Sequence, residues 1–134
     1  MIQRDYTIEK AIKTSETSLE SIVITDGDGI IVHCNNNWTR VCGYAKNEVV
    51  GKKNNILQGV LTEPYIINEI NNAVSIKQIT TEVVVTNYKK SGITFKNHLT
   101  ILRLIGGFAA IVRDMGLCDY TLSYNQNTNA LLNN

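Results

Sequence analysis

The hydrophobic pattern near the N-terminus changes from helical to alternating within a short stretch. Ile8, Ala11 and Ile12 recur at helical spacing among charged residues, which predicts an amphipathic helix over residues 7–18. Two β-branched runs, at 22–25 and 30–32, flank the sequence Asp-Gly-Asp-Gly. Asp-Gly pairs between such runs are typical of a hairpin turn, because both residues tolerate positive φ. The chain is therefore expected to begin with a helix and two paired strands.

Short helical segments are predicted in the middle of the chain. Residues 35–42 have an apolar face and are followed by Gly43, which suits the left-handed conformation at a helix end. Residues 46–50 predict another helical turn that ends at Gly51. Residues 52–59 predict one more, so three short helical segments are expected in a row.

A longer helix and three strands are predicted for the second half. Thr62 suits an N-cap, and Pro64 is tolerated in a first helical turn because no internal N–H bond is lost there. The apolar stripe of this helix consists of Ile66, Ile67, Ile70 and Val74. The pattern then alternates, which predicts antiparallel strands at 79–90, 93–104 and 108–115.

This order of elements predicts an α+β fold, with one five-stranded antiparallel sheet and short helices on one of its faces. The length of 134 residues suits one domain with short extensions. We expect an N-terminal flanking helix at 1–20, the sheet domain at 21–115 and a C-terminal tail at 116–134. Outward positions on the last strands include apolar residues that need a cover, namely Val84, Tyr88, Leu102 and Leu104.

Charge and cysteine content narrow the function classes. Thirteen Lys and Arg against twelve Asp and Glu give a net charge of +1, without the basic excess of a nucleic-acid binder. No apolar window approaches the length of a membrane-spanning helix, so no membrane association is expected. Cys34, Cys42 and Cys118 are odd in number and lack a metal-ligand spacing. The chain is therefore expected to be intracellular, in the cytoplasm.

The stretch "DGDGIIVHCNNNWTRVCGYAKNEVVGKKNNILQG" resembles the PAS superfamily. The carrying features are the asparagine after the second strand, the aromatic residue three positions later and the sequence "GY…NEVVG". "ILQG", then "LTEP" and "TNYKKSGITFKN", are similar to the light-oxygen-voltage (LOV) branch of that superfamily. The resemblance covers residues 22–114 and implies a PAS fold. LOV domains bind flavin mononucleotide (FMN) and sense blue light.

Four positions depart from what this resemblance implies. Asn54 stands where the family has the cysteine that adds to the flavin, and an amide is not a comparable nucleophile. Asn55 and Asn71 stand where two arginines usually hold the flavin phosphate, and a neutral amide cannot replace their charge. Val112 stands at the position of the glutamine that relays the flavin's chemical state. The usual adduct and its relay are therefore not expected.

Three pocket amides remain as candidate cofactor-binding residues. Asn87 and Asn97 match the two asparagines that bind the pyrimidine edge of the flavin, and Gln58 belongs to "ILQG". Strand alternation places Asn87 and Asn97 on an apolar, inward face, where a buried amide needs partners. A ligand would satisfy these amides. Bonds to each other, to Gln58 or to trapped water would satisfy them equally well.

Two functions follow from these residues. The first is a PAS signalling or protein-interaction domain that has lost adduct chemistry and carries no cofactor, acting as a homodimer or with a partner protein through the sheet face or the N-terminal helix. The second is a sensor that retains FMN with a redox response, or that binds another small molecule. An enzyme is not expected, because neither a nucleophile–base pair nor a suggestive carboxylate pair is visible.

Overall fold

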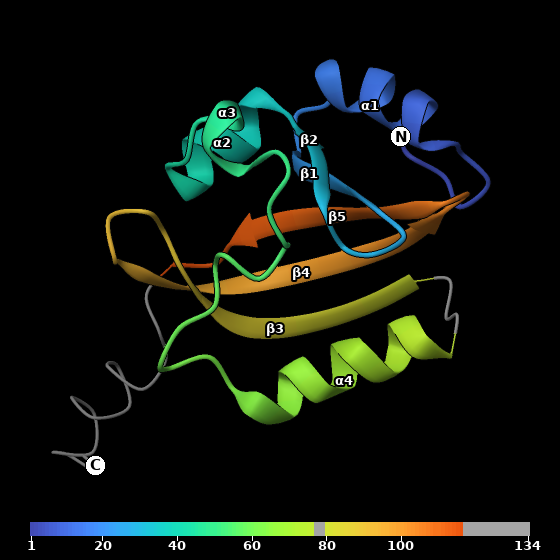
Figure 1. Ribbon diagram of the computed structural model, residues 1–134. Coiled ribbons are helices and arrows are strands. Elements are labelled where there is room, and N and C mark those ends of the chain that lie inside the picture. The colour runs from blue at the N-terminus through green and yellow to red at the C-terminus, as the bar shows by residue number, and fades with distance from the viewer. Residues whose placement is uncertain (77–79, 117–134) are drawn as a thin grey trace, which may run out of the picture.

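A five-stranded antiparallel sheet forms the centre of the computed structural model, which describes residues 1–76 and 80–116 (Figure 1). The spatial order of the strands is β2 (Ile31–Cys34), β1 (Ser21–Asp26), β5 (Gly107–Asp114), β4 (Thr94–Leu104) and β3 (Thr80–Tyr88). The first and last strands of the chain thus pair side by side in the middle of the sheet. This arrangement confirms the expected α+β fold.

Within the described residues, four helices cover the sheet on both of its faces: α1 (Ile8–Glu16), α2 (Asn36–Cys42), α3 (Lys46–Val49) and α4 (Pro64–Ser75). Helix α1 lies beside β1 and β2, whereas α4 runs along β3 at the opposite side of the molecule (Figure 1). The predicted C-terminal tail lies outside the described residues, apart from Gly116.

The inner face carries the larger core. Trp38 of α2 and Phe95 of β4 are almost fully buried there, with Val23 of β1 and Val112 of β5. Strand alternation explains this set, because Val23 and Val112 are inward positions on neighbouring strands. The inner core therefore joins the short helices to the centre of the sheet.

A second core lies on the outer face, under α1. Ala11 of this helix is fully buried and belongs to one cluster with Ile22, Ile24 and Leu104. Helix α1 is therefore the cover that part of the outward apolar face needs. Val84, on the β3 side of the same face, remains 49% exposed.

Capping explains where the first two helices begin. The Thr7 hydroxyl accepts a 3.1 Å hydrogen bond from the Lys10 N–H at the start of α1. The Asn35 side chain accepts one of 3.0 Å from the Trp38 N–H at the start of α2. Gly43 ends α2 with φ at 88°, as its predicted left-handed role requires.

Two local predictions were wrong. Residues 52–59 form turns rather than a helical turn, because the segment pairs with the hairpin between β1 and β2. The Asn54 N–H donates to the carbonyl of Gly29, and Lys53 forms a β-bridge with Ile30. Thr62 is not the N-cap of α4, a position held by Glu63. The Thr62 hydroxyl instead donates a 2.7 Å bond to the carbonyl of Thr86.

That bond belongs to a clasp along the free edge of β3, formed by residues 57–63. The Glu63 carboxylate accepts from the N–H and the hydroxyl of Thr86, both at 2.8 Å. The Tyr88 N–H donates to the carbonyl of Leu57 at 2.7 Å. An edge strand is a template for unwanted pairing, and this loop covers part of it.

Candidate functional site

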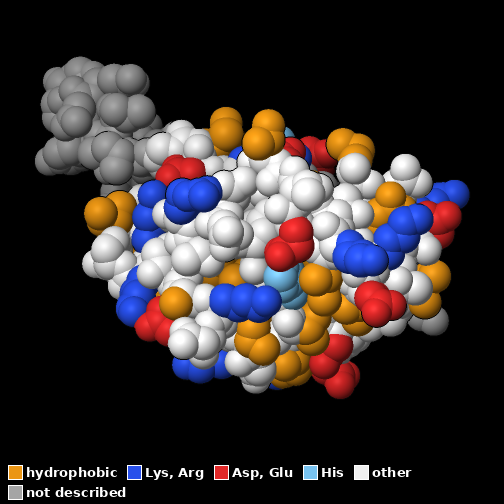
Figure 2. All heavy atoms as spheres, turned by 90° about the horizontal axis from the view of Figure 1, so that it is seen from above, with side chains coloured by type: hydrophobic (Ala, Val, Ile, Leu, Met, Phe, Trp, Pro, Cys, Tyr) orange, Lys and Arg blue, Asp and Glu red, His pale blue; other side chains and the backbone are white. Residues whose placement is uncertain are grey.

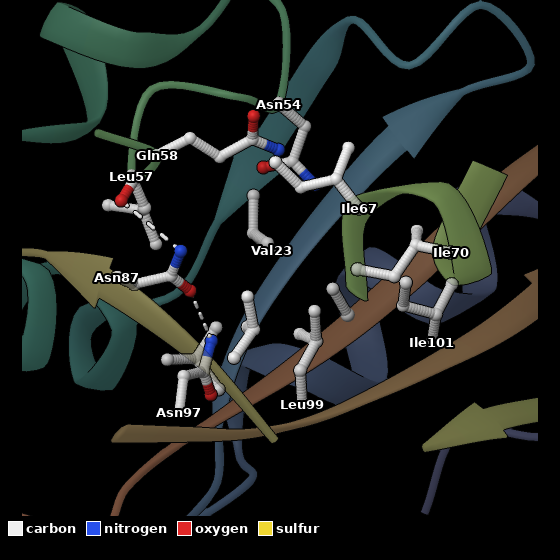
Figure 3. A pocket seen from close by; sticks show the side chains of 13 residues that line it. Val23, Asn54, Leu57, Gln58, Ile67, Ile70, Asn87, Asn97, Leu99 and Ile101 are labelled. Atoms are coloured by element: carbon white, nitrogen blue, oxygen red, sulfur yellow. Dashed lines mark hydrogen bonds between the residues drawn. The ribbon is translucent and has the colours of Figure 1, made fainter. Parts of the chain in front are cut away.

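A cavity of about 100 Å³ lies between α4 and the inner face of the sheet (Figure 3). Ile67 and Ile70 of α4 face it from one side, and Leu99 and Ile101 of β4 from the other. The wall is completed by Val23, Asn54, Leu57, Gln58, Val85, Asn87, Asn97, Ala110 and Val112. The cavity is therefore an apolar space with a few amide groups, which is the usual composition of a small-molecule site.

Two of these amides are bonded to each other. The Asn97 side-chain nitrogen donates to the Asn87 side-chain oxygen at 2.8 Å (Figure 3). Asn87 in turn donates to the carbonyl of Leu57 at 3.2 Å, and the Asn97 oxygen accepts from the Arg113 N–H at 3.1 Å. Both side chains are buried, so their hydrogen bonds within the protein remove the energetic need for a ligand.

Asn54 and Gln58 behave differently. Both line the same cavity from the loop before α4 and are exposed (Figure 3). Neither side chain has a hydrogen-bond partner among the described residues, although the Asn54 backbone is paired with Gly29. Their donors and acceptors are therefore available to a molecule that enters the cavity.

A second cavity, of about 250 Å³, adjoins the first near the hairpin turn. Its lining includes Thr25 and Asp28 from the hairpin, Asn71 and Val74 from α4, and Phe108 from β5. Both cavities share Asn54, Ile70, Ile101 and Ala110. They are therefore neighbouring parts of one space between α4 and the sheet.

The candidate residues divide between these places. Val112 is buried and lines the first cavity, whereas Asn71 lines the second. Asn55 is exposed and lines neither cavity. Asp28 was not among the predicted site residues, because the pattern Asp-Gly-Asp-Gly predicts only a turn. Its position in a hairpin that faces α4 becomes evident only in the folded chain.

Cys34 and Cys42 lie elsewhere. Both are buried in the inner core with Trp38, and neither lines either of the two cavities described above. Burial raises the pKa of Cys34, and it raises the pKa of Cys42 to about 12. Both side chains are thus neutral thiols near pH 7, and neither can reach a molecule in the cavities.

Two other kinds of function, metal binding and membrane spanning, find no support in the described part of the chain. Residues 1–76 and 80–116 contain no group of three or more His, Cys, Asp or Glu side chains that could hold a metal ion. Within the same ranges, none of the helices is both long and apolar enough for a membrane span. Lys and Arg are interspersed with Asp and Glu on the face shown in Figure 2.

A family model described as "PAS domain" matches residues 19–116. The blue-light photoreceptor of Listeria monocytogenes is 34% identical over 93 residues, covering 67% of this chain and 36% of that protein. A blue-light-activated histidine kinase of Rhizobium johnstonii is 33% identical over 112 residues, covering 81% of this chain and 32% of that protein. The chain thus spans about a third of the length of these curated relatives.

Solved structures agree with the sequence matches. The LOV domain of the Erythrobacter litoralis EL346 blue-light activated histidine kinase superposes with a TM-score of 0.70 and 27% identity. The superposition covers 74% of this chain and 98% of that domain. The similarity therefore extends over most of this chain and nearly all of that domain.

Proposed function

We propose that this chain, which belongs to the PAS domain family and to its LOV branch, is a signalling domain that works without a cysteinyl–flavin adduct. The proposal includes the loss of productive FMN binding. The sequence resemblance motivates both parts, because it places Asn54, Asn55 and Asn71 where a LOV domain has the adduct-forming cysteine and the phosphate-binding arginines.

One observation carries the proposal. Asn54 is the side chain that reaches the cavity from the expected cysteine position, while Cys34 and Cys42 are buried in the inner core. An adduct requires a thiol within bonding reach of the ring, and the described part of the chain offers none there. The bond between Asn87 and Asn97 supports the loss of FMN, because it satisfies the amides that would otherwise bind the flavin edge.

The signal would be passed by contact with another protein. Helix α1 covers only part of the outer face, and the β3 side of that face keeps Val84 49% exposed, near the hydrogen bond between His98 and Glu82. We propose that this open part of the sheet, or α1 itself, contacts a second copy or an intracellular partner protein. The domain then acts through binding rather than as an enzyme.

The test is a visible absorption spectrum of the purified chain, before and after incubation with excess FMN and desalting. We expect no flavin band in either sample and no spectral change under blue light. A retained flavin band that bleaches in blue light and recovers in the dark would overturn the proposal. A band that is retained without bleaching would overturn the loss of FMN but leave the adduct-free function standing.

A second candidate function, a ligand-binding sensor, is favoured by one specific observation. The cavities persist in the folded chain, and Asn54 and Gln58 line the first of them with unused hydrogen-bonding groups. Such a sensor would respond to occupancy or to ligand reduction instead of to an adduct. Mass spectrometry of the purified chain under native conditions tests it, since a bound metabolite adds its mass to the protein.

A further inference from the structure

We propose that the two adjoining cavities form a site for an uncharged, flavin-like heterocycle without a phosphate group, and that the site rejects the phosphorylated form. This inference deepens the proposed function, because it rests on an adduct-free PAS domain and names the ligand class that its cavity takes. It does not depend on how the domain passes on a signal.

The space between α4 and the sheet has the size of a small ring system. The cavities measure about 100 and 250 Å³ and share four lining residues. Ligand pockets range upward from about 300 Å³, so the joined space lies at the small end of that range. A compact heterocycle fits this volume better than a nucleotide with an extended tail.

The walls of the space suit a flat apolar body. Ile67 and Ile70 of α4 line one side, and Leu99 and Ile101 of β4 line the opposite side (Figure 3). Leu99 and Ile101 are inward residues of the sheet yet are only half-buried. A ring between these side chains would cover apolar surface that the protein itself leaves open.

Polar groups at the loop side would orient such a ring. The side chains of Asn54 and Gln58 each offer one acceptor and two donor hydrogens, and neither is engaged by the described residues. Asn87 and Asn97 are bonded to each other and to the backbone, so they form a fixed wall. An uncharged heterocycle with ring nitrogens and carbonyl groups matches the open amides of Asn54 and Gln58.

The second cavity is the more open of the two, and we call it the mouth of the space. It is unsuited to a phosphate. Asp28 lines the second cavity with Asn71, and none of the described lining residues of either cavity is Lys, Arg or His. A phosphate monoester carries about two negative charges near pH 7. At this mouth it would meet a carboxylate and neutral amides, without the guanidinium fork that phosphate sites usually provide.

Arg103 pairs with Phe108 across β4 and β5, and its guanidinium already contacts other groups. Its guanidinium stacks on the Phe108 ring at 4.8 Å from the ring centroid, and it donates a 2.7 Å bond to the carbonyl of Val74. Phe108 and Val74 line the second cavity, but Arg103 does not. Its charge therefore serves the C-terminal end of α4.

Riboflavin and FMN are the matched probes for this proposal, since they differ only by the phosphate. Quenching of flavin fluorescence during titration with the full chain gives the two dissociation constants at equal ionic strength. We expect riboflavin to bind at least about tenfold more tightly than FMN, which corresponds to about 1.4 kcal/mol. Equal or tighter binding of FMN, or no binding of riboflavin, would overturn the inference.

Charge variants locate the discrimination at the mouth. Asn71→Arg places a cation at the second cavity, and we expect it to tighten FMN binding and so to lower the ratio of the FMN dissociation constant to that of riboflavin. Asn72→Arg is the matched control, because Asn72 is exposed on the same helix but lines neither cavity. Asp28→Asn removes the carboxylate of the second cavity, and it should also reduce the difference between the dissociation constants of FMN and riboflavin. Equal effects of Asn71→Arg and Asn72→Arg would contradict a local site.

Failure of this inference differs from failure of the proposed function. Absence of riboflavin binding sinks the ligand class, while the adduct-free domain stands. Blue-light bleaching of bound FMN contradicts the proposed function, whatever the ratio of the two affinities.

An Ile70→Trp variant fills both cavities and should abolish riboflavin binding, with its folding checked by circular dichroism. Undiminished binding in that variant, once folded, would place riboflavin outside this space and overturn the inference.

Discussion

The side-chain nitrogen of Asn35 donates a 2.9 Å hydrogen bond to the carbonyl of Ser15, near the C-terminal end of α1. The same nitrogen donates to the carbonyl of Glu20 at 2.8 Å, and the side-chain oxygen accepts from the N–H groups of Ile22 and Trp38, both at 3.0 Å. One buried amide thus ties α1 to the first strand and to the start of α2.

Asn35→Ala is expected to destabilise the domain by about 2–4 kcal/mol, because it removes an N-cap and leaves several buried polar groups without partners. Urea unfolding followed by circular dichroism measures this change. Asn36→Ala is the matched control, since Asn36 is the exposed next residue of α2. A change below about 1 kcal/mol for Asn35→Ala, within the ordinary range of a single hydrogen bond, would contradict this role.

The contact between α1 and β2 predicts a pH effect. Burial and the charge of Lys46 lower the pKa of His33 from 6.5, while the hydrogen bond to Glu16 at 2.8 Å opposes that shift. The unfolded chain therefore takes up the proton first, and stability is lost as the pH falls below 6.5. Nuclear magnetic resonance titration of the His33 ring should give a pKa below that value.

Glu16→Ala removes the group that opposes the shift, so the pKa of His33 should fall further. Glu9→Ala serves as control, because Glu9 lies exposed in the first turn of the same helix. A rise of the His33 pKa in Glu16→Ala would show that another group governs this imidazole.

Glu63→Gln tests the clasp on the edge of β3. The variant weakens two bonds to Thr86 and the ion pair with Lys96, and we expect a loss of about 1–3 kcal/mol at pH 7. Burial favours the neutral acid, but the Thr86 bonds outweigh it and lower the pKa of Glu63 from 4.5. Because the folded state holds the charged form, this contribution is present above pH 4.5 and disappears as the pH falls further.

Urea unfolding of the two proteins at a series of pH values measures this effect. The difference in free energy of unfolding between wild type and Glu63→Gln should shrink below pH 4.5. Glu69→Gln, exposed on α4, should show no such trend. A difference that stays constant down to acid pH would mean that the carboxylate form of Glu63 is not what holds the edge.

Asn54→Cys tests whether a thiol alone restores a LOV photocycle. The substitution places a thiol on the cavity wall, but the neutral residues Asn55 and Asn71 remain where phosphate-binding arginines are expected. We therefore expect no light-induced bleaching after incubation with FMN and desalting, measured as absorbance before and after blue light. Bleaching with slow recovery in the dark would show that the phosphate grip is dispensable.

Much of the fold could be predicted from periodicity and turn residues. The change from helical to alternating spacing marked the three long strands, and Gly43 ended α2 with the positive φ that its position indicated. Residues 52–59 were mispredicted because local propensity competes with tertiary pairing, and here the Asn54 N–H bonds to Gly29. Local pattern cannot reveal a partner that lies on another element.

The candidate site was less accessible to sequence reasoning for the same reason. Alternation placed Asn87 and Asn97 inward, but it left two ways to satisfy the hydrogen-bonding groups of these amides: a bound ligand or a hydrogen bond between the two side chains. The choice depends on the antiparallel register, which pairs Asn97 with Val85 and sets Asn87 diagonally across from it. Asp28 escaped notice because its meaning comes from the distance between a hairpin and α4, which no short motif encodes.

The "ILQG" segment also has a structural role, because it packs on and bonds to the edge strand β3. A side chain at Gly59 would collide with the Tyr88 ring, and the Tyr88 hydroxyl accepts a 2.9 Å bond from the Leu61 N–H. The preceding Leu57 bonds to both Tyr88 and Asn87 through its carbonyl. A motif search that matches these letters therefore detects how an edge strand is closed, and assigning a photochemical activity requires reading the reactive position separately.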